Sequence, residues 1–347
     1  MFGIEVKPIY IIAECAQGYA SSSLEESIAL ALLLTRCAKA SGAEAVKFQL
    51  VIASELATQD YKHYDLFKSL ELGFSGWQQV AALAKTLELD LIFDIFGPSS
   101  LLMAENLGAS AVKIHPTDFT NLELIRKVAS SSVKNVIAGC GGATRSEIEM
   151  TIKELVNSES LTLLHGFQGY PTPRADNCLS RLGFLKGLID QSTIPLKLGF
   201  ADHADPSSPD STHLAGVSLG YGVSVLEKHL TIAKCLQLED HESALSPDEF
   251  HAFVEIINNC YDAKSQSFIL ETSFDLPDSE KAYRKAVARH VVAKFDLDSN
   301  HTIGSSDICL KRTGSSDFIS DPLLVIGKKT TMPIKADSPF TFATVEQ

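Results

Sequence analysis

Two histidines stand where strands are expected to end. His203 and His229 each follow an apolar run, and an acidic residue, Asp202 or Glu227, comes just before each of them. Two imidazoles at adjacent strand ends can hold one divalent metal ion, so the pattern predicts a metal site. Other interpretations stay open. Each histidine also suits an ordinary loop, and the acidic residues could orient the rings or neutralise Lys228.

Short apolar runs alternate with helix-like segments along most of the chain. They cover residues 9–13, 45–50, 89–93, 111–114, 135–138, 161–164, 196–200 and 223–226. Such runs are typical of strands buried on both faces. Ser23, Thr144 and Ser246 each precede a glutamate by three residues, which predicts capped helix starts between the strands. Eight strand–helix units predict a TIM (β/α)8 barrel rather than an open sheet.

Reactive side chains of a TIM barrel follow the carboxyl ends of its strands. The candidates at these positions are Glu14, Lys47, Gln49, Asp94, Lys113, the glycine turn 139–142, His165, Asp202, His203, Glu227 and His229. Lys47 and Lys113 interrupt apolar runs, where a buried ammonium needs a neighbouring carboxylate or a bound anion. Both possibilities remain open, and the second predicts a phosphate or carboxylate substrate.

Three further residues have competing interpretations. His165, taken alone, fits a hydrogen-bonded core histidine. Cys140, in the glycine turn, suits packing better than nucleophilic chemistry, because no histidine adjoins it in sequence. Asp240 precedes His241 in a loop after the eighth expected strand, which is either a solvated turn or part of the barrel mouth.

Composition restricts the class of protein. The 347 residues are 45% hydrophobic and carry a net charge of −13, which argues against nucleic acid as a partner. Seven cysteines without a Cys-x-x-Cys pair indicate neither a disulfide framework nor a zinc knuckle. We expect a soluble cytoplasmic protein without a signal peptide or membrane span.

The pattern changes after residue 270. Residues 271–284 are polar and predict a linker, and residues 285–347 contain short apolar runs such as 291–293, 308–310 and 323–326. These predict a small β-rich domain after a barrel of residues 1–270.

Several motifs, taken in order, resemble the sialic acid synthase (N-acetylneuraminate synthase) family. They are residues 11–14, 43–49, 112–114, Thr120 with Asn121, 163–165, 170–173, Asp202 with His203, 227–230, and Asp240 with His241. Residues 289–293, 298–303 and 326–329 resemble the antifreeze-like (SAF-type, β-clip) domain that follows the barrel in that family. The resemblance therefore covers both expected domains.

The resemblance implies a phosphoenolpyruvate-dependent transferase that forms a carbon–carbon bond. Its acceptor would be an N-acetylated amino-sugar aldehyde, N-acetylmannosamine or a 2,4-diacetamido relative, and it would release phosphate and a nonulosonic acid. It also implies a divalent metal, Mn2+ or Mg2+, although Co2+, Fe2+ or Zn2+ also suit an imidazole pair. The expected assembly is a homodimer in which the C-terminal domain of one chain covers the other chain's barrel.

Carried over residue by residue, the resemblance implies three groups of site residues. The metal ligands are His203 and His229. The catalytic candidates are Glu14, Gln49 and Glu227, with Glu14 ordering a water molecule. The substrate-binding candidates are Lys47 and Lys113 for phosphoenolpyruvate, and Tyr170, Asp240 and Arg289 for the sugar.

The chain departs from the family pattern at several expected phosphate and sugar contacts. Asp94 stands in place of a hydroxyl residue, Pro116 and Ala201 in place of serines, and Gly169 in place of an asparagine. Three hypotheses follow: a synthase with an altered acceptor pocket, a catalytically weakened barrel that binds a sugar or a partner, or a phosphoenolpyruvate-dependent synthase for another aldose.

Overall fold

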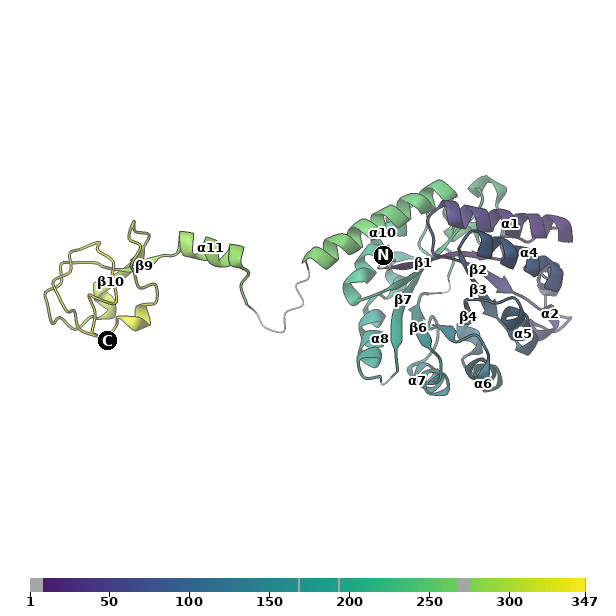
Figure 1. Cartoon of the computed structure of the whole chain (residues 1–347), viewed down its shortest axis with the longest axis horizontal. Helices are drawn as coiled ribbons and strands as arrows, with labels where there is room; N and C mark the ends of the chain where they lie inside the picture. Colours follow the sequence, from purple (N-terminus) through teal and green to yellow (C-terminus); the bar gives the residue numbers. More distant parts are fainter. Residues whose placement is uncertain (1–8, 168, 193, 268–274, 347) are drawn as a thin grey trace. The chain divides into compact units, whose positions relative to one another are not determined.

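The computed structural model describes residues 9–167, 169–192, 194–267 and 275–346. The chain divides into two compact units, Met1–Ile269 and Leu270–Gln347. In the first unit the helices lie outside a ring of strands (Figure 1).

Eight parallel strands close this ring, with β1 paired to both β2 and β8. They are β1 (Tyr10–Ala16), β2 (Ala45–Leu50), β3 (Asp90–Ile95), β4 (Ala111–Ile114), β5 (Asn135–Gly139), β6 (Ser160–His165), β7 (Leu196–Asp202) and β8 (Val225–His229). The predicted TIM barrel is confirmed.

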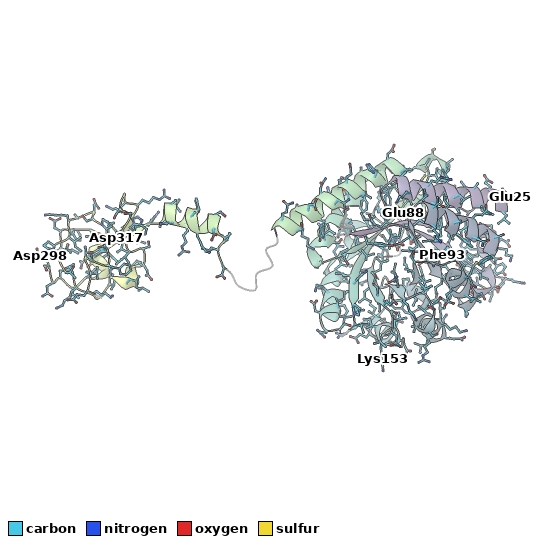
Figure 2. All side chains as sticks on the ribbon, in the orientation of Figure 1. Glu25, Glu88, Phe93, Lys153, Asp298 and Asp317 are labelled. Carbon is cyan, nitrogen blue, oxygen red and sulfur yellow. The ribbon has the colours of Figure 1, made fainter. Side chains whose placement is uncertain are left out.

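Side chains alternate between the two faces of each strand. One inward side chain from every strand forms an apolar layer inside the barrel: Ile12, Ala45, Ile92, Ala111, Ile137, Leu164, Ala201 and Val225. Outward side chains pack under the helices; Phe93 lies 5.1 Å from Trp77 of α4, measured between ring centroids. Figure 2 labels Phe93 within the barrel unit and Glu25 and Lys153 at its surface.

The helices of the barrel unit surround the strands. They are α1 (Leu24–Ala40), α2 (Ala53–Leu56), α3 (Tyr64–Ser69), α4 (Gly73–Thr86), α5 (Pro98–Asn106), α6 (Leu122–Ser130), α7 (Arg145–Glu154), α8 (Ser180–Asp190), α9 (Asp210–Ser218) and α10 (Pro247–Ser267). No helix of the described residues is long and apolar enough to cross a membrane.

The predicted helix starts are present, with one difference. Thr144 and Glu147 form a complete capping box at α7. Ser23 accepts a hydrogen bond from the N–H of Glu26 at α1, but the Glu26 carboxylate bonds to the Ser21 hydroxyl instead of returning to the cap backbone. A helix N-terminus needs only some of its free N–H groups capped by side chains, so α1 still begins as predicted.

The second unit contains helix α11 (Asp278–Val287) and an antiparallel pair, β9 (His290–Ala293) and β10 (Ile308–Lys311). Isolated bridges such as Leu297 to Ile334 hold its remaining extended segments around a separate apolar core. The expected linker lies partly outside the described residues, and from Asp278 onward it is helical. The run 323–326 is not a strand: Pro322–Leu324 forms a 3-10 turn, because proline at its first position favours a turn.

Candidate active site

Five charged side chains meet inside the barrel at the carboxyl ends of its strands. Each lies two residues beyond a member of the apolar inner layer, so strand alternation points all five inward. They are Glu14 of β1, Lys47 of β2, Asp94 of β3, Lys113 of β4 and Glu227 of β8, and all are buried.

The lysines pair with the carboxylates. The Nζ atom of Lys47 lies 2.8 Å from Oδ2 of Asp94 and 3.5 Å from Oε2 of Glu227, and it also pairs with Glu14. The Nζ atom of Lys113 lies 2.8 Å from Oε1 of Glu227 and 3.8 Å from Oδ2 of Asp94. Carboxylate partners, one of the two possibilities left open by the sequence, are therefore present for both lysines.

Burial and pairing act in opposite directions on these groups. Burial would lower the pKa of Lys113, but Asp94 and Glu227 outweigh burial and raise it. Burial would likewise raise the pKa of both carboxyls, but the two lysines lower it. At Lys47 burial has the larger effect and lowers the pKa. The Asp94 and Glu227 carboxylates are therefore held ionised.

Glu14 is also held by its own strand. The pairing of β1 with β2 shifts register between Glu14 and Ala16. The N–H of Ala16 donates to Oε1 of Glu14 at 2.6 Å, so one carboxylate oxygen is fixed by the backbone while the other faces Lys47. This irregularity fixes the orientation of the carboxylate.

The two predicted metal ligands lie side by side. The ring centroids of His203 and His229 are 5.2 Å apart, and the Tyr170 ring lies 4.8 Å from the first and 5.4 Å from the second. Burial lowers the pKa of His203 to about 4 and that of His229 well below its usual value. Both rings are therefore neutral near pH 7, the form that binds a metal ion.

A hydrogen bond selects the free nitrogen of His203. Its Nδ1–H donates to the Phe167 carbonyl at 2.7 Å, which leaves Nε2 as the lone-pair nitrogen. No group of three or more His, Cys, Asp or Glu side chains within the described ranges is placed to hold a metal. The donor set thus fits an ion that takes two protein nitrogens and completes its coordination with oxygen from water or substrate.

The acidic neighbours of the histidines have separate roles. Asp202 pairs with Lys228 at 3.2 Å on the outer side of the barrel, whereas Glu227 faces inward to the site lysines. Of the two roles that the sequence left open for the acidic residues, Asp202 neutralises Lys228. Glu227 instead forms ion pairs with the site lysines.

Three other predicted site residues, Gln49, Tyr170 and Asp240, lie around the same end of the barrel. Gln49 accepts a hydrogen bond from Gln17 at 2.7 Å. Asp240 has a left-handed backbone with φ of 63°, and burial together with Glu239 raises its pKa to about 6. Tyr170 and Asp240 are close enough for the Asp240 charge to raise the pKa of the Tyr170 phenol, after the larger effect of burial. Arg289 belongs to the second unit, where it is exposed.

Two candidates lie outside the site. His165 points away from the barrel interior and its Nε2 lies 2.8 Å from the carbonyl of Asn177, as expected of a core histidine. Burial raises the pKa of the Cys140 thiol to about 12, which disfavours the thiolate needed of a nucleophile.

Comparison with known proteins identifies the family of this chain. Residues 34–268, more than half of the sequence, match the sequence pattern of the NeuB family. This chain belongs to the NeuB family. The predicted resemblance to sialic acid synthases is confirmed.

Several relatives of this NeuB-family chain are named as acid synthases. It is 26% identical over 358 residues to N,N'-diacetyllegionaminic acid synthase of Legionella pneumophila, covering 97% of this chain and 94% of that protein. It is 24% identical over 361 residues to pseudaminic acid synthase of Helicobacter pylori, covering 99% of each. The crystal structure of a sialic acid synthetase from Leptospira borgpetersenii shares the fold, with a TM-score of 0.69 and 24% identity over 81% of this chain and 92% of that one.

Sequence reasoning missed one side chain of this NeuB-family site. The side chain is His115, two residues beyond Lys113. Burial lowers its pKa to about 4, and the charges of Asp94 and of both site lysines also act on this pKa. Its Nδ1 lies 2.8 Å from the Thr117 hydroxyl, and its ring centroid is 5.9 Å from that of Phe96. The signal was available, because residues two apart on a strand share a face.

Proposed function

We propose that this NeuB-family chain condenses phosphoenolpyruvate with the open-chain aldehyde of an N-acetylated amino sugar, N-acetylmannosamine or a 2,4-diacetamido relative. The products would be phosphate and a nonulosonic acid. The observation that carries the proposal is the juxtaposition of two buried lysines and two neutral histidines at the carboxyl ends of the barrel strands. The names of the relatives support this product class.

The lysines suit the donor and the histidines suit the acceptor. Lys47 and Lys113 would bind the carboxylate and phosphate of phosphoenolpyruvate. His203 and His229 would hold a divalent ion, with Mn2+ or Mg2+ expected, which acts as a Lewis acid on the aldehyde oxygen. Tyr170 beside both imidazoles, with Asp240 near it, would contact the sugar.

The carboxylates complete the assignment. The enol carbon attacks the aldehyde carbon, and water then adds to the oxocarbenium carbon before phosphate leaves. Glu14, fixed by Ala16 and Lys47, would orient that water. Gln49 would lie against the reacting carbons, and Glu227 would balance the charge of Lys113 between cycles. The contribution of Arg289 and the homodimer remain predictions.

Phosphate release from phosphoenolpyruvate tests the proposal. Purified protein supplied with Mn2+ would be assayed with N-acetylmannosamine, its 2,4-diacetamido relatives and phosphorylated aldoses. We expect sugar-dependent release that His229→Ala abolishes and that His251→Ala, a change at an exposed histidine of α10, retains. No release with any N-acetylated acceptor would overturn the proposal, and strict preference for a phosphorylated aldose would redirect it to another acceptor class.

One observation favours a second candidate function. Both site lysines already have carboxylate partners, and Asp94 stands where the family pattern has a hydroxyl residue. A barrel that binds a sugar or a partner without turnover would show this. Tight sugar binding without phosphate release in the same assay would support that alternative.

A further inference from the structure

The buried cluster carries an excess negative charge. Two ammoniums, of Lys47 and Lys113, face three carboxylates, of Glu14, Asp94 and Glu227, so these side chains, when all are ionised and no metal ion is counted, have a net charge of −1. The proposed donor has a carboxylate and a phosphate whose second ionisation lies near pH 6. Above neutrality this anion would lie beside the ionised Asp94 carboxylate, and a contact between like charges is costly away from water.

Asp94 is the group whose protonation would remove this conflict. Its Oδ2 is shared between the ammoniums of Lys47, at 2.8 Å, and Lys113, at 3.8 Å. Its Oδ1 is buried and has no hydrogen-bond partner among the described residues. A proton on this carboxyl would remove the Asp94 charge from both lysines, which keep Glu14 and Glu227 as partners, and would give Asp94 an O–H donor of its own.

The surroundings of Asp94 come from several elements. The charged and titratable groups that face it are Lys47 of β2, Lys113 of β4, His115 beyond β4, Tyr170 of the loop after β6, and Glu227 of β8. In the unliganded site the lysines keep Asp94 ionised, and an anion that takes over their hydrogen bonds would withdraw that stabilisation.

Resting on the proposed function, we propose that the donor anion binds together with one proton from solvent, and that Asp94 holds this proton. An O–H bond forms at the carboxyl and no other covalent bond changes. Protonated Asp94 then presents a hydroxyl to the anion at the position where the family pattern has a hydroxyl residue. The two lysines lower the pKa of Asp94 in the unliganded site against the effect of burial, and this pKa would have to rise above the pH of the solution once the anion takes over their hydrogen bonds.

His115 is the rival site for the proton. Its ring is half-buried, and its pKa is lowered by burial and is also affected by the charges of Asp94 and of both lysines. A proton on His115 would leave the Asp94 carboxylate ionised beside the anion, whereas a proton on Asp94 removes that like charge. Substituting Asp94 and His115 one at a time shows which of them takes up the proton.

Calorimetric titration with phosphoenolpyruvate, between pH 7.0 and 8.5 in two buffers of different ionisation enthalpy, tests the proposal. We expect uptake of about one proton and a Kd that rises about tenfold per pH unit. Asp94→Asn, a neutral amide of the same shape, is expected to bind without proton uptake, with a pH-independent Kd at least tenfold lower at pH 8.5. Asp94→Thr, which supplies a hydroxyl directly, is a second variant with the same expected pH independence.

Asp90→Asn is the matched control, because it removes an exposed carboxylate at the opposite end of the same strand and should retain proton uptake. Wild-type binding without proton uptake would overturn this inference and leave the proposed function standing. Uptake retained in Asp94→Asn but lost in His115→Gln would place the proton on His115 and also overturn it. Failure of phosphoenolpyruvate to bind the wild-type, Asp94→Asn and Asp94→Thr proteins at every pH would overturn both proposals.

Discussion

The Asp202 carboxylate lies 3.2 Å from the Lys228 ammonium, and both side chains are buried. Strand alternation turns this pair toward the outer face of the barrel, while their neighbours His203 and Glu227 turn inward. The ion pair therefore neutralises a buried charge next to the candidate site without being part of it.

Breaking this pair should be strongly destabilising. Asp202→Ala leaves Lys228 as an uncompensated buried charge, so we expect the free energy of unfolding to fall by about 3–5 kcal/mol. Asp210→Ala, which removes the partner of the exposed Arg174 side chain, should cost less than about 1 kcal/mol. Urea unfolding measures both, and equal losses would contradict the buried role of Asp202.

Removing one imidazole should empty the proposed metal site. With two protein nitrogens as the donor set, loss of His229 leaves a single ligand from His203, so His229→Ala should carry no stoichiometric Mn2+ after dialysis. Metal analysis and activity would be measured together with the His251→Ala control. Full metal content and activity in His229→Ala would show that the ligands lie elsewhere.

Lys113 should contribute to both binding and stability. Among the described residues, Lys113→Ala leaves Glu227 with only the longer 3.5 Å contact to Lys47, so we expect lower thermal stability and at least tenfold weaker phosphoenolpyruvate binding. The double variant Lys113→Ala/Asp94→Asn removes one charge of each sign. It should recover part of the stability but not the full donor affinity, because an ammonium is still missing. No coupling between the two changes would contradict the shared cluster.

Asp240 should make stability depend on pH. Its pKa is raised to about 6 by burial and by Glu239, so the native state binds more protons than the unfolded state between about pH 4 and 6. The contribution of Asp240 to the free energy of unfolding therefore decreases as the pH rises through that window, and it is absent at higher pH. Asp240→Asn, which tolerates the left-handed backbone, should flatten the dependence and add roughly 1–3 kcal/mol at pH 7.5.

Chemical unfolding at pH 4.5 and 7.5 would measure this effect. Asp205→Asn is the control, because hydrogen bonds from Ser207 lower the pKa of that carboxyl instead. If Asp240→Asn and the wild-type protein showed the same pH dependence of unfolding, Asp240 would not be the titrating group.

The sequence by itself determined the strands, the helix starts and the polar residues near the carboxyl ends of the strands. Apolar runs that alternate with helix-like segments predicted the barrel, the Thr144 box predicted the start of α7, and Lys47 and Lys113 were selected because they interrupt apolar runs. These features are local, since they depend on propensity, capping and hydrophobic pattern. Because these features are local, they did not show whether His165 belonged to the site.

Only the tertiary structure decided which inward residues meet. Glu227 and Lys113 pair from β8 and β4, which lie on opposite sides of the ring, and no local pattern relates positions 114 residues apart. Likewise, Asp94 joins the lysines and His115 faces them because barrel closure and strand stagger set which side chains share a level. Barrel closure also decided the ionisation of Asp94, Lys113 and Glu227. The burial and the paired charges that shift their pKa values arise only when distant strands enclose the same space.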